Sequence, residues 1–249
     1  MLIAAAIAVL AILFGAPQND LLILKLSKPV KQIVVDPDKK TEILSEIKDV
    51  KNLQKVYDKK TKVFTKELRV LAMDQSTDKA AFDAFYATVV EYEINTNKTF
   101  IPHRIAIQEN MTQEEWDAVI SATSKAIKKS KKSNDKILNK FKKTLDKFET
   151  NIQKNIVDQD RKEKAGVYVK EFSTSLYDIV VKILEYDQTE EKILLDNEAT
   201  YAELESLMEE SNKEWMSSFV GLSTLHAELA ALATADEWKH IAKELKKII

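Results

Sequence analysis

The stretch "LAMDQSTDKAAFD" at residues 71–83 has a counterpart, "LEYDQTEEKILLD", at residues 184–196, which lies 113 residues later. Asp, Gln, a hydroxyl side chain, Lys and Asp recur in both at the same mutual spacing. When residues 48–83 are compared with 161–196, eight of 36 positions are identical, more than unrelated helices of this composition would share. We therefore predict an internal duplication, with two related helical units in tandem.

The similarity continues beyond the quoted corner, with a changing separation. Asn97-Lys98 matches Asn212-Lys213 at a separation of 115 residues, and "MTQEEW" (111–116) matches "ATADEW" (233–238) at 122. Growing separations indicate small insertions in the second copy.

Two neighbouring rows of apolar residues accompany the first corner. Each row repeats every seven residues, which is typical of a helix packed on partners. The rows are Val56, Val63 and Val70, and Tyr57, Phe64 and Leu71. We expect both rows to form one buried stripe.

The composition favours a helical protein. Only three Gly and four Pro interrupt 249 residues, whereas sheets of many short strands need frequent turn residues. The absence of Cys excludes disulfides, thiolate catalysis and Cys-based metal sites. A formal net charge of −2 gives no overall field that would attract nucleic acid. We predict an all-α fold, an elongated helical bundle.

The N-terminus, "MLIAAAIAVLAILFGA", contains no charged side chain and is short for a membrane span. It is interpreted as a signal anchor or transmembrane segment over residues 1–24 that tethers the chain to a membrane, and a buried N-terminal helix is the alternative. We expect the body to be extracytoplasmic, or periplasmic. Lys25, Lys28 and Lys31 favour the other orientation, on the cytoplasmic face, because positive flanks tend to stay in the cytoplasm.

The remaining chain divides into three parts. Residues 25–42 contain β-branched residues, Pro29 and Pro37 without a helical stripe, and we expect a stalk or linker there, extended or as one short strand. Helical unit 1 is predicted over residues 43–135. Helical unit 2 is predicted over residues 136–249 and includes the connecting basic helix.

The connecting segment, residues 125–147, contains ten Lys, and residues 185–215 contain eleven Asp or Glu. An apolar stripe, Leu138, Phe141, Leu145, Phe148 and Ile152, predicts that the basic segment is a helix with one buried face. Its lysines either form a solvated face neutralised by the acidic segment or bind an acidic protein, an unfolded client or anionic lipid. The lack of Arg and of a recognition motif argues against nucleic acid. The candidate partner-binding face comprises Lys125, Lys128, Lys129, Lys131, Lys132, Lys136, Lys140 and Lys143.

"MTQEEW" and "ATADEW" predict helix N-termini with capping boxes, in which Thr112 and Glu115, or Thr234 and Glu237, exchange hydrogen bonds. Both motifs also resemble the LTxxQ repeats of Spy-like periplasmic chaperones, which are small exported helical proteins that hold unfolded clients. Leu is Met or Ala here and Gln is Glu, and the capping box explains the six residues without kinship. Ser76 and Thr189 are further candidate caps.

Few residues suggest catalysis or metal binding. Glu237 and His240 have the Glu-x-x-His spacing of carboxylate-bridged metal bundles, but the first copy has Ala118 in place of His240. His103 and His226 are expected at the surface or at helix ends. We assign no catalytic, cofactor-binding or metal residue and expect no cofactor.

The sequence thus favours a non-enzymatic, membrane-tethered helical protein that binds another protein, associates with itself or acts as a scaffold. A Spy-like periplasmic holdase is one alternative, and a metal- or ligand-binding helical enzyme is another.

Overall fold

The computed structural model describes residues 22–184 and 188–249, without the side chains of residues 124–134, 183–191, 211, 212, 214 and 215. Throughout these ranges the chain is helical and contains no strand, which confirms the all-α prediction. The helices are α2 (Ile23–Ile33), α3 (Pro37–Met73), α4 (Lys79–Glu109), α5 (Gln113–Asn155), α6 (Gln159–Leu184), α7 (Gln188–Leu195), α8 (Tyr201–Leu232) and α9 (Ala235–Ile248).

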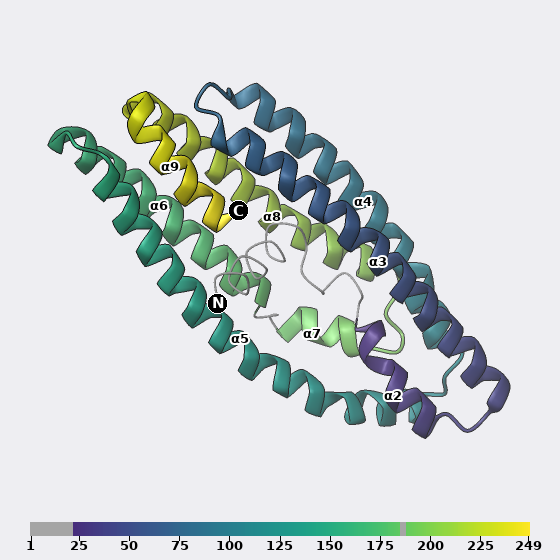
Figure 1. Cartoon of the computed structure of the whole chain (residues 1–249). Helices are drawn as coiled ribbons and strands as arrows, with labels where there is room; N and C mark the ends of the chain where they lie inside the picture. Colours follow the sequence, from purple (N-terminus) through teal and green to yellow (C-terminus); the bar gives the residue numbers. More distant parts are fainter. Residues whose placement is uncertain (1–21, 185–187) are drawn as a thin grey trace.

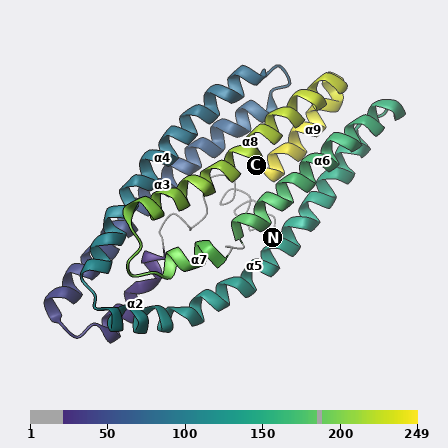
Figure 2. The same cartoon turned by 180° about the vertical axis from the view of Figure 1, so that it is seen from behind.

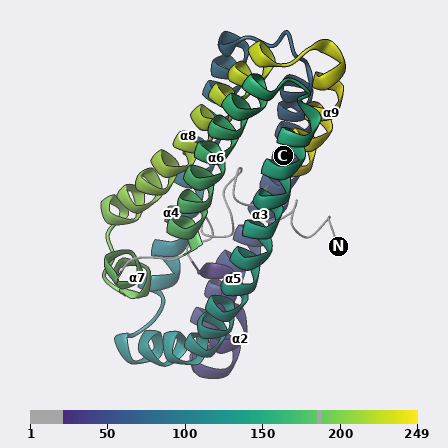
Figure 3. The same ribbon diagram turned by 90° about the vertical axis from the view of Figure 1, so that its left-hand side faces the viewer.

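The long helices lie side by side in an elongated bundle (Figure 1). Helix α5 extends along one side of it, with α2 near one of its ends and α9 near the other (Figure 2). Helix α6 packs against both α5 and α8, and α4 packs against α3 and α8. Seen from the side, α5 and α8 lie on opposite sides of the bundle (Figure 3).

The bundle has two hydrophobic cores, one toward each end. The first core joins α2 and the beginning of α3 to the end of α4, and it contains Trp116. The second core joins the end of α5 and the beginning of α6 to the end of α8, and it contains Trp238. Each core also takes residues from the other half of the chain, with Leu194 and Leu204 in the first and Leu68 and Phe82 in the second.

The polar corner after α3 turns the chain by side-chain capping. Helix α3 ends at Met73, and Asp74 Oδ1 then accepts hydrogen bonds from the backbone N–H and the hydroxyl of Ser76. Asp78 caps α4 by accepting from Ala81 N at 2.8 Å, so the N-cap is Asp78 and the Ser76 prediction is wrong. Thr189 likewise lies inside α7.

The apolar stripe of α5 is confirmed, because Leu138, Phe141, Leu145, Phe148 and Ile152 are all buried. The stripe predicted on α3 is only half right. Tyr57 and Phe64 are buried and Leu71 packs against the second core, but the parallel valine row is exposed. The exposed fractions are 62% for Val56, 43% for Val63 and 69% for Val70.

The expected stalk at residues 25–42 is instead mostly folded helix. Helix α2 buries Ile23, Leu26 and Val30, which are spaced three and four residues apart and pack in the first core. Pro29 is accommodated inside this helix. Asp36 caps α3 by accepting from two backbone N–H groups, and Pro37 occupies the first turn, where a missing N–H costs nothing.

The predicted anchor, residues 1–24, lies almost entirely outside the described residues. Within the described ranges, no helix combines the length and the apolar character that a bilayer span requires.

Five helix boundaries in the first half of the chain have a counterpart 122 residues later, and the ends of α4 and α8 are 123 residues apart. For example, α3 ends at Met73 and α7 ends at Leu195, which is 122 residues later (195 − 73). The paired boundaries are Ile33 and Asn155, Pro37 and Gln159, Met73 and Leu195, Lys79 and Tyr201, and Gln113 and Ala235. The corners at 74–78 and 196–200 are 122 residues apart, which differs from the separation of 113 residues seen between the quoted stretches of sequence.

Candidate protein-binding surface

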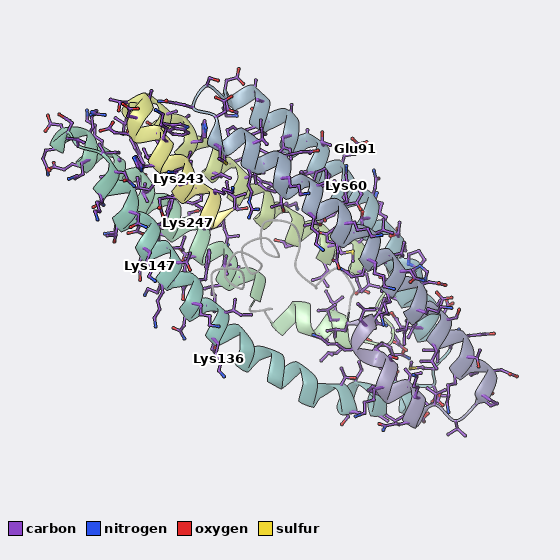
Figure 4. All side chains as sticks on the ribbon, viewed as in Figure 1. Lys60, Glu91, Lys136, Lys147, Lys243 and Lys247 are labelled. Carbon is purple, nitrogen blue, oxygen red and sulfur yellow. The ribbon has the colours of Figure 1, made fainter. Side chains whose placement is uncertain are left out.

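Four lysines form one exposed face of α5. Lys136, Lys140, Lys143 and Lys147 follow one another at steps of four, three and four residues, which places them on one side of a helix. The buried stripe beginning at Leu138 occupies the opposite side. Lys136 points away from the bundle, with Lys147 further along the same helix (Figure 4). We call these four residues the lysine face.

The other five candidate lysines, Lys125, Lys128, Lys129, Lys131 and Lys132, lie in the part of α5 whose side chains are not described. In the sequence, three of them (Lys125, Lys129 and Lys132) continue the spacing of the lysine face backwards. From Lys125 to Lys147 the helix is roughly 33 Å long at 1.5 Å per residue.

Helix α9 extends the positive surface. Lys243 and Lys247 are exposed on α9, which packs beside α5 (Figure 4). Between the two helices, Glu244 accepts a hydrogen bond from Asn151 of α5 at 2.9 Å and pairs with Lys247 at 2.5 Å. One buried carboxylate therefore joins the helices and partly neutralises Lys247.

The described part of the acidic segment, residues 188–215, lies mainly against helices other than α5. Helix α8, which contains much of that segment, packs against α4, α6 and α7, whereas the main partners of α5 are α2, α6 and α9. Among the described residues, no ion pair involves Lys136, Lys140 or Lys143. Their charges are thus presented to solvent.

Both predicted capping boxes are present. Thr112 and Glu115 exchange hydrogen bonds at the start of α5, and Thr234 and Glu237 do so at the start of α9. The second box is reinforced, because Arg161 of α6 donates to both carboxylate oxygens of Glu237, at 2.5 and 3.2 Å. The Arg161 hydrogen bond, helped by the N–H groups of Val157 and Thr234, lowers the pKa of Glu237 to about 2.

Both carboxylate oxygens of Glu237 accept hydrogen bonds from protein donors, namely Arg161 and the backbone N–H groups of Val157 and Thr234. His240 on the same helix is exposed. No cluster of three or more potential metal-ligating side chains occurs in the part of the chain that the structure describes.

The two tryptophans of the capping motifs hold the two corners. Trp116 Nε1 donates to the carbonyl oxygen of Leu195 at 2.8 Å, and Trp238 Nε1 donates to that of Met73 at 2.9 Å. Each tryptophan therefore binds the end of a helix in the other half of the chain. A buried carbonyl at a helix end needs such a donor, because no helical N–H remains to pair with it.

Arg104 and His226 lie beside these tryptophans. Arg104 was not predicted, and His226 was expected at the surface or at a helix end. The guanidinium of Arg104 lies 4.1 Å from the centre of the Trp116 ring and donates to the carbonyl oxygens of Leu194 and Asp196. Burial lowers its pKa to about 9, so the group remains charged at neutral pH. His226, 122 residues later (226 − 104), packs edge-on against Trp238, and its Nε2 lies 2.9 Å from the carbonyl oxygen of Asp74.

The histidines differ from expectation. His226 is buried, and removal from water lowers its pKa. His103 is half-buried, with its Nδ1 2.5 Å from a carboxylate oxygen of Glu46. The two residues therefore serve contacts within the bundle.

A groove between α3 and α4 has a volume of about 460 Å³ and is lined by Leu53, Val56, Lys60, Phe64 and Tyr92, among others. Lys60 Nζ lies 4.4 Å from the centre of the Phe64 ring. A second groove, of about 720 Å³, lies beside α6, and its lining includes Ser175, Asp178 and Lys182.

No protein-family model, curated protein or solved structure matches the chain.

Proposed function

We propose that this chain is a non-enzymatic, membrane-tethered helical protein whose lysine face binds an acidic protein partner, so that the protein acts as a binding module or scaffold. The supporting observation is the exposure of Lys136, Lys140 and Lys143 without ion pairs among the described residues. Lysines without internal partners keep their full attraction for an acidic surface and accelerate its association.

We also infer that the bundle arose by duplication of a four-helix unit with a separation of 122 residues. Residues 23–126 and 145–248 are then the two units, and residues 127–144 connect them. The shared spacing of five helix boundaries supports this inference, as do three pairs of equivalent contacts. Glu115 and Glu237 accept from Val35 N and Val157 N, Trp116 and Trp238 bind the opposite corners, and Arg104 and His226 contact Asp196 O and Asp74 O.

In the proposed duplication, three residues of the lysine face lie between the two units. Lys136, Lys140 and Lys143 lie on the exposed side of the connector, whereas its buried side supplies Leu138 and Phe141 to the second core. Stabilisation of the units therefore does not explain why the connector is basic. An external acidic partner does explain it.

The tether is the second component of the proposal. The uncharged run at residues 1–16 supports a membrane anchor. We place the body outside the cytoplasm because an N-terminal apolar segment before a soluble body is more often an export signal than an inward anchor. Membrane fractionation followed by protease treatment of intact and opened cells tests this placement. Protection of the body in cells with a permeabilised outer envelope, and digestion only after lysis, would place it in the cytoplasm.

The binding role is tested by affinity capture from membranes with the full-length chain. We compare the wild type with a variant carrying Lys136→Glu, Lys140→Glu and Lys143→Glu. The expected result is an acidic protein that the wild type recovers at least tenfold more efficiently than the variant, with recovery falling as salt rises because exposed charges are screened.

A matched control keeps the same charge change but moves it to exposed lysines near the start of α3: Lys39→Glu, Lys48→Glu and Lys51→Glu. This control should recover the partner as the wild type does. Equal recovery by all three proteins, or no protein above background, contradicts the proposed role of the lysine face.

The Spy-like holdase is our second proposal, favoured by the groove between α3 and α4. That groove combines the apolar residues Leu53, Phe64 and Tyr92, which a holdase surface needs, with one basic residue, Lys60, and one acidic residue, Glu91. Suppression of the aggregation of a chemically denatured client by stoichiometric amounts of the protein is the expected result. Unchanged client aggregation would dismiss this role.

A further inference from the structure

We propose that α3 docks an acidic amphipathic helix of a partner protein along the exposed row of Val56, Val63 and Val70, which we call the valine seam. The three side chains are exposed by 62%, 43% and 69%, and no described helix covers them. They are one heptad apart on one helix, which is the spacing that a partner helix reads when two helices pack along a seam.

The fold does not require apolar residues at these positions. At the separation of 122 residues, the equivalents of the valine seam are Asp178, Glu185 and Lys192, all of them charged. Asp178 and Lys192 are exposed, so these two positions of the second unit have the composition usual for a solvent-facing row. The first unit has three valines there, and an external contact accounts for the difference.

The seam continues into the groove between α3 and α4. Val56 lines both, and Phe64 and Tyr92 provide an aromatic wall beside it. The partner helix can therefore place a larger apolar side chain in the groove next to Val56. Such an anchor in a pocket is the usual energetic centre of an interface.

The charge around the seam selects the partner. Residues 51–70 contain seven Lys or Arg and two acidic residues, Asp58 and Glu67. Lys59, Lys60 and Lys66 lie three or four residues from a valine of the seam and therefore border it on the helix surface. Glu67 borders it by the same spacing, so lysines outnumber acidic residues along the seam. Glutamates flanking the apolar row of a partner helix would pair with these lysines, as charges beside a coiled-coil seam do.

The seam fits a partner segment of moderate length. From Val56 to Val70 the helix rises about 21 Å at 1.5 Å per residue, or two heptads, and further contacts with the groove extend it. A helical partner of three to four heptads covers this surface.

The test uses the purified full-length chain in a non-ionic detergent and two synthetic helical peptides of four heptads. Both peptides have Leu and Ile at the seam positions, and they differ only in having Glu or Lys at the flanking positions. Fluorescence anisotropy should show the acidic peptide binding at least tenfold more tightly than the basic one. The triple variant Val56→Gln, Val63→Gln and Val70→Gln should weaken binding of the acidic peptide at least tenfold.

Two control proteins separate this surface from the others. Three exposed valines elsewhere, changed as Val157→Gln, Val167→Gln and Val220→Gln, remove the same amount of apolar surface and should leave binding unchanged. The variant Lys136→Glu, Lys140→Glu and Lys143→Glu should also bind the acidic peptide normally. Circular dichroism confirms that each variant is folded.

Several outcomes would overturn the proposal. Equal binding of both peptides would assign the groove to unselective, holdase-like contacts. Loss of binding in the Lys136→Glu, Lys140→Glu and Lys143→Glu variant alone would assign the peptide to the lysine face. Self-association of the full chain that the seam variant abolishes in sedimentation would make a second copy the occupant. Because the lysine face is tested with a different variant, failure of the seam leaves the proposed function standing.

Discussion

The indole N–H of Trp238 donates a hydrogen bond to the carbonyl oxygen of Met73, 165 residues earlier in the chain, at 2.9 Å. Trp116 makes the same bond to Leu195. These two contacts close each half of the bundle on a helix end from the other half. Stability should therefore depend on both bonds.

Replacing Trp238 with Phe keeps an aromatic ring in the second core but removes the donor to Met73. We expect the free energy of unfolding to fall by about 1 kcal/mol, because the partly buried carbonyl of Met73 then loses its donor. Trp116→Phe should give a loss of similar size, since the geometry is equivalent. Urea unfolding followed by circular dichroism measures both, and a variant as stable as the wild type would show that the bond has no net value.

Arg104→Met removes two hydrogen bonds to backbone carbonyls and the contact with the Trp116 ring. We expect a loss of about 2–4 kcal/mol in the free energy of unfolding, which combines unpaired buried acceptors with a lost cation–π contact. Arg104→Lys keeps the charge but not the planar fork, and it should be intermediate. Chemical denaturation compares the three proteins, and a Met variant more stable than the Lys variant would contradict this order.

Glu237→Gln should destabilise the protein more than Glu115→Gln. Both changes weaken a capping box, and the loss of a cap typically costs about 1 kcal/mol. Only Glu237 also forms an ion pair with Arg161. The residue equivalent to Arg161 in the first unit is Lys39. Thermal unfolding of the two variants in parallel measures the difference, and equal losses would mean that Arg161 adds nothing.

The lowered pKa of Glu237 also predicts an acid dependence. Because the folded pKa of about 2 lies below the ordinary value of 4.5, this carboxylate stabilises the fold above pH 4.5. That stabilisation is lost as the pH falls from 4.5 toward 2. The stability of the Glu237→Gln variant should therefore change less than that of the wild type over this range, as urea titrations at several pH values will show.

His226 predicts a pH dependence in a different window. Its folded pKa is lowered by burial, so below about pH 6.5 the unfolded chain binds a proton that the folded chain does not. This contribution is present above pH 6.5 and is lost as the pH falls below it. The wild type should lose more stability than His226→Asn between pH 7.5 and 5.5, and a parallel change in both proteins would exclude His226 as the cause.

Local patterns predicted local structure well. Scarce Gly and Pro indicated helices, and the steps of three and four from Leu138 to Ile152 identified the buried side of α5. The capping boxes depend only on residues three apart, so Thr112 with Glu115 and Thr234 with Glu237 could be found without knowing the fold.

Long-range relationships could not be read in the same way. The heptad spacing does not reveal which of two adjacent rows faces the core. On α3 the row with Tyr57 and Phe64 is buried, and the valine seam is exposed. The burial of Arg104 depends on Trp116 and on a corner some 90 residues away. Pro29 and the β-branched residues around it concealed the apolar stripe of α2.

The separation of 122 residues had a signal in the sequence. "VVDPDKK" at residues 34–40 and "IVDQDRK" at 156–162 share four of seven residues at this separation, and Asp36 and Asp158 in these motifs cap α3 and α6. The similarity between the corners at 71–83 and 184–196 indicates a separation of 113 residues instead. Helical segments rich in Lys, Glu and Leu match one another at many offsets, whereas a short motif at a helix start is specific.

Because Trp116 binds Leu195 and Trp238 binds Met73, each half of the chain depends on the other half for its fold. If the chain were cut within the connector, neither fragment would have a complete core, because each lacks the helix end that its own tryptophan binds. The two fragments should fold only as a complementing pair, like the subunits of an obligate heterodimer. In the intact chain the connector keeps these two subunits at a high effective concentration, so the protein behaves as a heterodimer that is already covalently linked.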